Sequence, residues 1–274
     1  MKCACNHISP GLNCPCPFGA AKENAWERNK KIESLIKEKD AKGESYSSDD
    51  KNFISQYSGA GGQAKQGAKG VGVLYEFYTP DWLCKAMWQL AEKHGFKGGT
   101  VLEPSCATGN LIKDAPDKSK VYAFETNPIT KRIAEILYPE LKIYKGFFET
   151  AFLQPPRFTQ KLKGQYSWLQ GYPFDLVIAN PPYGKYTNQY SSYFTKPQLP
   201  SMETFFMYYG LHLLKPGGLL VYLISSNFLR NGVTYEKAKT EIADVGQLVD
   251  AYRLPPVFEY SEVPVDVLVI KRIE

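Results

Sequence analysis

The sequence has no apolar run approaching the ~20 residues that a membrane-spanning helix needs. Its first residues, Met1-Lys2-Cys3-Ala4-Cys5, lack the apolar core of a secretion signal, so we expect a cytoplasmic protein with no membrane partner. No internal repeat is evident. With 274 residues, 43% of them hydrophobic, the chain can bury one full core, or one core and a small appendage.

Cysteine is scarce beyond the first sixteen residues, which hold four of the six: Cys3, Cys5, Cys14 and Cys16, with His7 between the two pairs. A disulfide framework is not expected in a protein that is not exported. Two thiolate pairs could hold a structural zinc, but their C-x-C spacing differs from the usual C-x2-C, so a disordered leader without metal is favoured. Cys84 and Cys106 fall within expected structural elements, and we expect both side chains to be small, buried and apolar.

Charge of one sign does not dominate: the net charge is +5 and the pI is about 8.7, which permits a polyanionic partner without requiring one. Aromatic residues are abundant, at 14%, and several lie in polar loops. That placement suits stacking on nucleic-acid bases.

The first 70 residues are expected to form an N-terminal extension. Its parts are the Cys-bearing leader, an amphipathic helix over 22–42, a short helix capped around Ser47 and ending near Tyr57, and a Gly/Lys-rich linker from Ser58 to Gly70. Residues 71–274 are expected to form the catalytic domain.

From residue 71 the pattern alternates between helices and strands. Strands are expected at 99–103, 120–125, 141–144, 174–179, 219–224, 247–253 and 265–270, and helices at 81–95, 128–137, 204–214 and 235–244. This alternation predicts an α/β fold with a doubly wound, mostly parallel, seven-stranded Rossmann-like sheet. The last two strands are joined by a short segment without a helix, so we expect that pair to be antiparallel.

The tetrapeptide Asn180-Pro181-Pro182-Tyr183 follows directly on the apolar strand at 174–179. Two prolines must end the strand, so it delivers an amide, two stiff carbonyls and an aromatic ring to the carboxyl edge of the sheet, where such folds bind ligands. Fixed acceptors beside a flat surface suit a planar heterocycle with an exocyclic amine. The alternative is an ordinary strand followed by a Pro-Pro turn.

A second candidate region is the turn after the first strand, Glu103-Pro104-Ser105-Cys106-Ala107-Thr108-Gly109-Asn110-Leu111. Small residues there let backbone amides approach a ligand closely, although the turn does not match G-x-G-x-x-G. Glu125 ends the second strand, where a carboxylate can accept both ribose hydroxyls of an adenosine cofactor. Its alternative is an ordinary acid at a strand end.

Four motifs occur in the order Phe77-Tyr78-Thr79-Pro80, Glu103 to Asn110, Glu125, and Asn180 to Tyr183. This order resembles the S-adenosylmethionine-dependent amino-methyltransferases that modify N6 of adenine in DNA, the Asn-Pro-Pro-Tyr class of type I and type IIG modification. The tail, with Arg253-Leu254-Pro255-Pro256 and 265–272, looks like the end of their catalytic domain. The segment from Ser58 to Pro80 also resembles the methylase modules of large phage antirestriction methylase–helicase proteins.

The resemblance implies S-adenosylmethionine as cofactor. It places Tyr78, Thr79 and Pro80 at the methionine end with Glu103, Pro104, Ser105, Ala107 and Gly109 beside it, Glu125 at the ribose and Phe147 on the adenine. The chain departs from the family twice. Ala107 stands where glycine is commonest, and Gly146 replaces the acid that usually binds the amine of the cofactor. Either Glu149 substitutes for that acid, or cofactor affinity is low.

The expected chemistry is methyl transfer to N6 of a flipped-out adenine. Asn180 Oδ1 and the Pro181 carbonyl would accept the amine N–H groups and free the nitrogen lone pair, while Pro182 stiffens the loop and Tyr183 stacks on the base. Phe258 is a candidate for the other face of the base, with a core position as its alternative.

Two segments are candidates for contact with DNA: Gln154 to Tyr172, with Arg157, Lys161, Lys163, Tyr166 and Trp168, and Gly184 to Pro200, with Lys185, Tyr186, Tyr190, Tyr193, Phe194 and Lys196. The alternative is loops whose aromatic rings cover the core. Because no recognition domain is expected after the last strand, either a separate specificity subunit or domain would recognise the target sequence, or specificity would be slight. Two other functions stay open: methylation of an RNA base or a protein glutamine, and a non-catalytic subunit that binds cofactor or DNA.

Overall fold

The computed structural model describes residues 25–58, 77–153, 166–230, 233–258 and 261–273. The candidate zinc cysteines and the Gly-rich linker lie outside these residues, and so do Arg157, Lys161 and Lys163. The helices are α1 (Ala25–Lys42), α2 (Ser48–Ile54), α3 (Asp81–Lys93), α4 (Pro128–Leu137), α5 (Met202–His212) and α6 (Val233–Ala243). The short 3-10 helices are η2 (Leu111–Asp114), η3 (Lys118–Lys120), η4 (Phe148–Phe152) and η5 (Ser191–Tyr193).

Seven strands form one sheet in the order β3-β2-β1-β4-β5-β7-β6. Their bounds are β1 (Val101–Glu103), β2 (Val121–Glu125), β3 (Lys142–Lys145), β4 (Phe174–Ala179), β5 (Leu214–Ser225), β6 (Gly246–Leu254) and β7 (Val265–Arg272). The pairs from β3 to β5 are parallel, whereas β7 runs antiparallel to both β5 and β6. The expected doubly wound sheet with an antiparallel last pair is confirmed. The insertion of β7 between β5 and β6 was not predicted.

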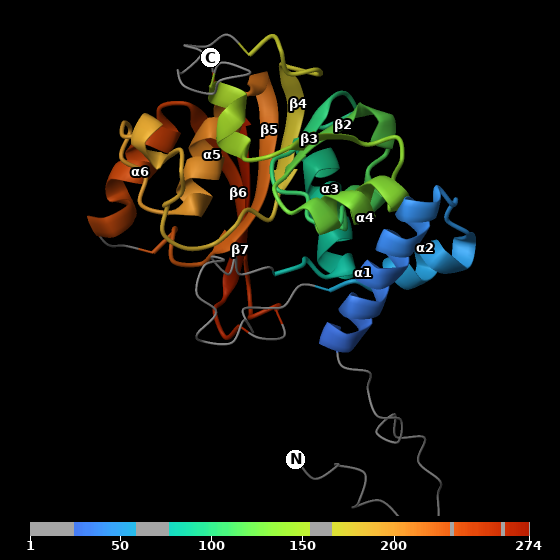
Figure 1. Ribbon diagram of the computed structural model, residues 1–274. Coiled ribbons are helices and arrows are strands. Elements are labelled where there is room, and N and C mark those ends of the chain that lie inside the picture. Colours follow the sequence, from blue (N-terminus) through green and yellow to red (C-terminus); the bar gives the residue numbers. More distant parts are fainter. Residues whose placement is uncertain (1–24, 59–76, 154–165, 231–232, 259–260, 274) are drawn as a thin grey trace, which may run out of the picture.

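Side chains of the central strands alternate between two apolar layers. From β5, Leu220 and Tyr222 enter the layer under α5, α6 and η4, while Leu219 and Val221 enter the layer under α3 and η2. Helices cover both faces in this way (Figure 1). Burial on both faces explains why these strands read as continuous apolar runs.

The element bounds agree closely with the sequence pattern except at β5. This strand begins at Leu214, five residues before the predicted start, because Leu214 pairs with Phe174 and the register then shifts so that Leu219 pairs with Leu176. The segment Lys215 to Gly218, which lies between the expected helix and the expected strand, is therefore an irregularity within the strand.

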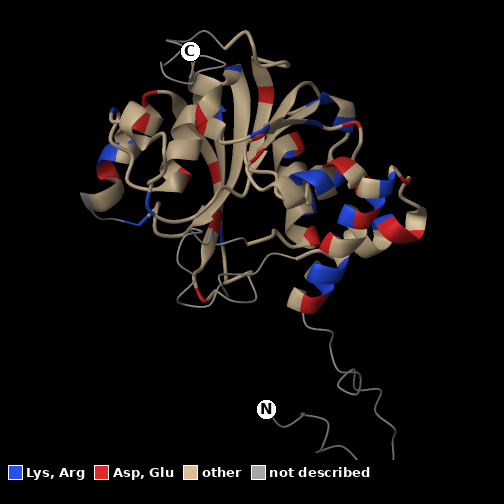
Figure 2. Ribbon diagram, viewed as in Figure 1, with Lys and Arg blue, Asp and Glu red and all other residues tan. Residues whose placement is uncertain are grey.

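The helices α1 and α2 pack against α4 through a small apolar cluster of Ile32, Ile36, Ile54, Ile133 and Ile136. Ser47 caps α2 in a capping box with Asp50, as the Ser/Asp pattern predicted. Charged side chains are dense on α1, α2 and α4 and sparse on the central strands (Figure 2). In the described part of the chain, no helix is long and apolar enough to cross a membrane.

Candidate active site

A pocket lies at the carboxyl ends of β1, β2 and β4. The chain passes from β1 outward to β2 and β3 and then returns to β4 on the other side of β1, so β1 and β4 flank the point where the strand order reverses. Open α/β sheets bind ligands at such a point. Most of the predicted site residues line this pocket: Tyr78, Thr79, Glu103, Pro104, Ser105, Ala107, Glu125, Phe147, Asn180, Pro181, Pro182 and Tyr183.

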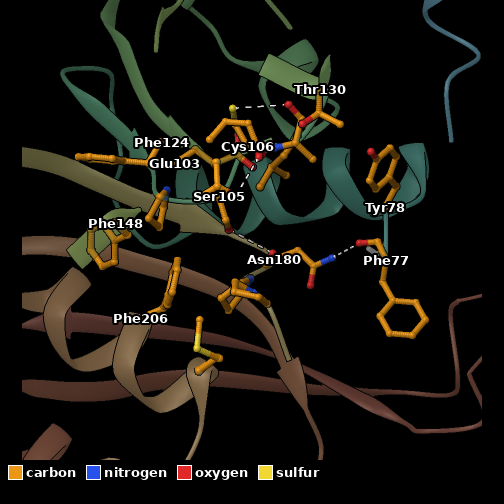
Figure 3. A pocket seen from close by; sticks show the side chains of 18 of the residues that line it. Phe77, Tyr78, Glu103, Ser105, Cys106, Phe124, Thr130, Phe148, Asn180 and Phe206 are labelled. Atoms are coloured by element: carbon orange, nitrogen blue, oxygen red, sulfur yellow. Dashed lines mark hydrogen bonds between the residues drawn. The ribbon is translucent and has the colours of Figure 1, made fainter. Parts of the chain in front are cut away.

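The Asn180 side chain is held at both ends. Its Nδ2 donates to the Phe77 carbonyl at 2.7 Å, and its Oδ1 accepts from the Tyr183 hydroxyl at 2.8 Å. Ser105 Oγ lies 3.4 Å from the Asn180 backbone carbonyl, so the turn after β1 also contacts the tetrapeptide (Figure 3). An amide oxygen has two lone pairs, so Oδ1 keeps one acceptor site.

The Tyr183 ring packs edge-on against two other aromatic rings. Its centroid is 5.9 Å from Phe77 and 6.1 Å from Phe258. Burial raises the pKa of the Tyr183 hydroxyl well above its usual value, so the group stays protonated and donates to Asn180. Phe258 is buried and does not line the pocket; its role as a base-stacking residue stays a prediction.

Glu125 links the turn after β1 to the turn after β2. Its Oε2 accepts from the Ala107 amide at 2.7 Å, and its Oε1 accepts from the Asn127 amide at 2.6 Å. Ala107 has a φ of +47°, in the left-handed region that favours glycine, which gives a physical reason for glycine being commonest at this position in the resembling family. Thr126 Oγ1 also lies 3.5 Å from Oε1 of Glu125, and the Glu125 side chain lines the pocket.

Glu103 ends β1 and is buried in the pocket wall. Its Oε2 has no hydrogen-bond partner in the described part of the chain. Burial, together with the nearby Glu125 carboxylate, raises the pKa of Glu103 to about 8. A buried acceptor left unsatisfied in this way calls for a ligand group or a proton.

The wall beyond β3 contains Gly146, the second position where the chain departs from the resembling family, and Glu149, its candidate substitute. Gly146 has a φ of +128° and open space where a Cβ would stand, a conformation that a residue with a side chain rarely adopts. Glu149 is buried in the pocket wall, with a pKa raised by burial, and its carboxylate accepts a hydrogen bond from Asn188 Nδ2. Phe147 contacts Tyr190 edge-on, with centroids 5.5 Å apart.

Two further predicted cofactor residues do not line the pocket. Pro80 precedes α3, and its carbonyl accepts from the amides of Leu83 and Cys84. Gly109 has a φ of +80°, and an added Cβ would lie 2.9 Å from the Tyr138 ring, so close packing accounts for this glycine.

The aromatic rings of the two candidate DNA-contact segments pack mostly on the core. Tyr186 stacks on Phe205 with centroids 4.2 Å apart, Phe194 is buried, and Trp168 packs edge-on against Tyr144. Tyr193, Lys185 and Lys196 remain exposed. For Tyr186, Phe194 and Trp168, the structure therefore agrees with the alternative interpretation, in which the aromatic rings cover the core.

Sequence reasoning missed several pocket residues. Phe124, Phe148 and Phe206 form apolar wall, and Thr130 contributes from α4. Asn188 reaches Glu149 across 39 positions of sequence. Phe124 could have been found from its position directly before Glu125, but no local pattern identifies the partner of Glu149.

The pocket residues suit S-adenosylmethionine. Aromatic walls suit the adenine, Glu125 suits the ribose hydroxyls, and the buried unsatisfied Glu103 suits a positively charged end. Among the described residues there is no group of three or more His, Cys, Asp and Glu side chains placed to hold a metal.

Comparison with known proteins identifies the class. The chain is 24% identical over 213 residues to the "Defense against restriction protein B" of Escherichia phage P1, covering 78% of this chain but only 8% of the phage protein. A candidate class I S-adenosylmethionine-dependent methyltransferase from Listeria monocytogenes has a similar structure, with a TM-score of 0.59, 17% identity and coverage of 75% of this chain and 64% of that one.

A type I restriction-modification methyltransferase subunit from Streptococcus thermophilus gives a TM-score of 0.56 at 21% identity, covering 72% of this chain and 45% of that one. The fold is therefore that of the class I S-adenosylmethionine-dependent methyltransferases, in agreement with the fold and cofactor expected from the sequence. The Eco57I restriction-modification methylase family matches residues 117–258, just over half of the chain. This protein belongs to the Eco57I restriction-modification methylase family.

Proposed function

We propose that this protein methylates N6 of adenine in DNA and uses S-adenosylmethionine as the methyl donor. The observation that carries the proposal is the Asn180 side chain, held by Phe77 and Tyr183 at the edge of a pocket whose other walls suit the cofactor. An amide fixed at both ends presents its remaining acceptor site in one direction, as a positioned catalytic group must.

The proposed cofactor site uses residues from three strand ends. Glu125 accepts the ribose hydroxyls, Phe147 packs on the adenine, and Tyr78, Thr79, Glu103, Pro104, Ser105 and Ala107 surround the methionine end. When bound, the cofactor supplies an electrophilic methyl group on a sulfonium. Three pocket carboxyl groups and no Lys, Arg or His among the described lining residues suit that positive charge.

Asn180 and Pro181 are the proposed activating groups. The exocyclic nitrogen of adenine is a poor nucleophile because its lone pair is delocalised into the ring. Asn180 Oδ1 and the Pro181 carbonyl accept its two N–H groups and draw the nitrogen toward tetrahedral geometry. The nitrogen would then form a bond to the methyl carbon as the carbon–sulfur bond breaks and sulfur keeps the electron pair, and the amine would release one proton to solvent. Positioning and electrostatic stabilisation account for the rate acceleration, and no side chain acts as a nucleophile.

The target base must leave the duplex to reach Asn180. Flipping costs a few kcal/mol, and stacking on an aromatic ring returns about 1–3 kcal/mol per base. Tyr183 is the proposed stacking residue, with Phe258 as a second candidate. The exposed Lys185 and Lys196, in the segment after the tetrapeptide, are proposed to contact phosphates, and a separate subunit or domain is proposed to read the sequence.

The substrate is tested directly by incubating the purified protein with S-adenosylmethionine labelled in its methyl group. Duplex DNA, single-stranded DNA, RNA and a glutamine-bearing release factor are offered in parallel, and the labelled product is digested to nucleosides or peptides. We expect N6-methyladenine from DNA. Label found only in RNA or protein would refute the proposed substrate, and no label in any arm would refute the enzymatic assignment for this chain.

Asn180 is tested by Asn180→Ala, with Tyr183→Phe as the companion variant. The alanine variant removes the proposed acceptor, so we expect methyl transfer to fall to background while cofactor binding, measured by calorimetry, survives. Tyr183→Phe keeps the ring and removes only the hydroxyl that orients Asn180, so we expect a smaller loss. Comparable turnover by Asn180→Ala and the wild type would sink the assigned chemistry.

A further inference from the structure

Glu103 is a buried titratable group at the proposed cofactor site, and the proposed chemistry does not specify its protonation state. Its side chain is 3% exposed, stands at the end of β1 in the pocket wall, and lies near Ser105 and Cys106 in Figure 3. Its Oε2 finds no hydrogen-bond donor in the described part of the chain. An ionised carboxylate in such a place is expensive unless a positive charge accompanies it.

The groups that face Glu103 do not provide that charge. They are Glu125 from β2, Cys106 from the turn after β1, Cys84 from α3, Tyr138 after α4 and Tyr222 from β5. Burial raises the pKa of each of these thiols and phenols, so they are neutral at pH 7. Glu125 adds repulsion. The described lining residues include three carboxyl groups and no Lys, Arg or His.

We propose that Glu103 makes the pocket selective for a ligand with net positive charge, because the Glu103 carboxyl group releases its proton when such a ligand binds. The inference rests on the proposed function in one respect, that the ligand is S-adenosylmethionine. A neutral carboxyl group and a ligand of charge +1 form a carboxylate–cation complex and one proton passes to solvent, so charge and atoms balance.

The consequence is discrimination between cofactor and product. S-adenosylmethionine and S-adenosylhomocysteine share the same carboxylate and ammonium groups, but only the former carries the sulfonium. Loss of that charge on methyl transfer leaves Glu103 uncompensated again, so the carboxyl group takes up a proton and the product is held less tightly. Because the pKa of Glu103 in the ligand-free pocket is about 8, the linked proton is bound at pH 7 and largely lost above pH 8.5.

The test measures binding of both ligands to the full chain by calorimetry from pH 6 to 8.5, without DNA. For the wild type, affinity for S-adenosylmethionine should rise with pH, by up to about tenfold per unit below pH 7.5 if one proton is fully coupled. Affinity for S-adenosylhomocysteine should stay nearly flat. Titration at pH 7 in two buffers of different ionisation enthalpy should show about one proton released with the cofactor and none with the product.

Glu103→Gln should abolish both the pH slope and the proton release. Glu203→Gln is the matched control, because Glu203 is also a buried carboxyl group with a pKa raised by burial but does not line the pocket; it should keep the wild-type slope. The buffer experiment on the wild type needs no variant, so it decides the question even if Glu103→Gln does not fold.

The outcomes separate this inference from the proposed function. Cofactor binding without proton release, or equal pH slopes for cofactor and product, overturns the role of Glu103 and leaves methyl transfer standing. Proton-linked binding combined with a failure to label any nucleic acid overturns the proposed substrate and leaves Glu103 standing. No binding of S-adenosylmethionine at any pH overturns both.

Discussion

At the scale of single residues, the pocket depends on a few side chains and backbone angles that cannot be exchanged freely. Ala107 occupies a conformation that favours glycine while its amide reaches Glu125. Asn180 has partners at both ends of its amide. Glu103 is buried, and its Oε2 has no hydrogen-bond partner among the residues that the structure describes. Each of these features lowers the stability of the folded state locally, and the packing of the surrounding sheet must offset that loss, as is common at functional sites.

Substitution of Ala107 tests the cost of its backbone angle. Because a β-branched residue tolerates positive φ poorly, Ala107→Val should lower the free energy of unfolding by about 1–3 kcal/mol. Ala107→Gly removes the steric conflict but adds freedom to the unfolded chain, so it should stay within about 1 kcal/mol of the wild type. Urea unfolding checks both. A valine variant as stable as the wild type would contradict the strained conformation.

The raised pKa of Glu103 predicts how stability depends on pH in the absence of ligand. The pKa is about 8 in the folded protein against 4.5 for a free glutamate side chain, so the folded state holds this proton more strongly than the unfolded state. That contribution is complete below pH 4.5 and is lost as pH rises through 8. Between pH 5 and 8, wild-type stability should therefore fall relative to that of Glu103→Gln. Parallel curves from thermal unfolding would show that Glu103 ionises normally.

At the scale of elements, the segment after β4 connects the two ends of the site. It begins with Asn180, and Gly184 accepts from the Met202 amide at 2.8 Å, which ties the loop to the start of α5. It then reaches the far wall of the pocket, where Asn188 donates to Glu149 and Tyr190 contacts Phe147. One segment thus carries the tetrapeptide and supports the wall proposed for the cofactor adenine.

Asn188 provides a test of that connection. Asn188→Ala leaves the buried Glu149 carboxyl group without this donor, and we expect cofactor binding to weaken by about 1–2 kcal/mol, or roughly 5- to 30-fold. Asn188→Asp should weaken it as well, although it keeps the acceptor that receives the Tyr190 amide. Ser192→Ala, at an exposed position of the same segment, is the control. If calorimetry showed unchanged cofactor affinity in both Asn188 variants, the segment after β4 would not support the cofactor site.

The elements were predictable where the pattern is local. The bounds of β4 and α4 agree with those expected, because one is an apolar run ended by two prolines and the other begins with Asn127 as cap and Pro128 at its first turn. The early start of β5 was missed because it depends on pairing with Phe174. The position of β7, the packing role of Gly109 and the Asn188–Glu149 contact were missed for the same reason, since each depends on residues distant in sequence.

At the scale of the whole molecule, the N-terminal helices pack against the catalytic sheet through α4. The apolar cluster includes Ile36 and Ile133, and Arg132 forms two hydrogen bonds to Asp40 at 2.8 and 2.6 Å. The Arg132 guanidinium lowers the pKa of Asp40. Whether α1 and α2 belong to a separate extension, as proposed from the sequence, is a question of how much free energy this contact supplies.

Two substitutions separate the contributions at this contact. Ile36→Ala removes buried apolar volume and should cost about 2–5 kcal/mol, whereas Asp40→Ala breaks a partly exposed ion pair and should cost about 1 kcal/mol or less. Chemical unfolding followed by far-UV circular dichroism measures both. A single cooperative transition shifted by Ile36→Ala would show that α1 and α2 unfold together with the catalytic domain. Two transitions, of which only the first is shifted by Ile36→Ala, would show that the helices unfold separately.

The placement of β7 between β5 and β6 affects how the protein must be made. β7 follows the other described strands of this sheet in the sequence, yet it is an interior strand that pairs on both sides, with Tyr222 of β5 opposite Leu268 and Ala251 of β6 also opposite Leu268. A growing chain that has not yet produced β7 leaves two unpaired strand edges side by side, which is a known route to aggregation. Assembly of this side of the sheet therefore waits until β7 has been synthesised, and chaperones that shield exposed strands should matter most in that interval.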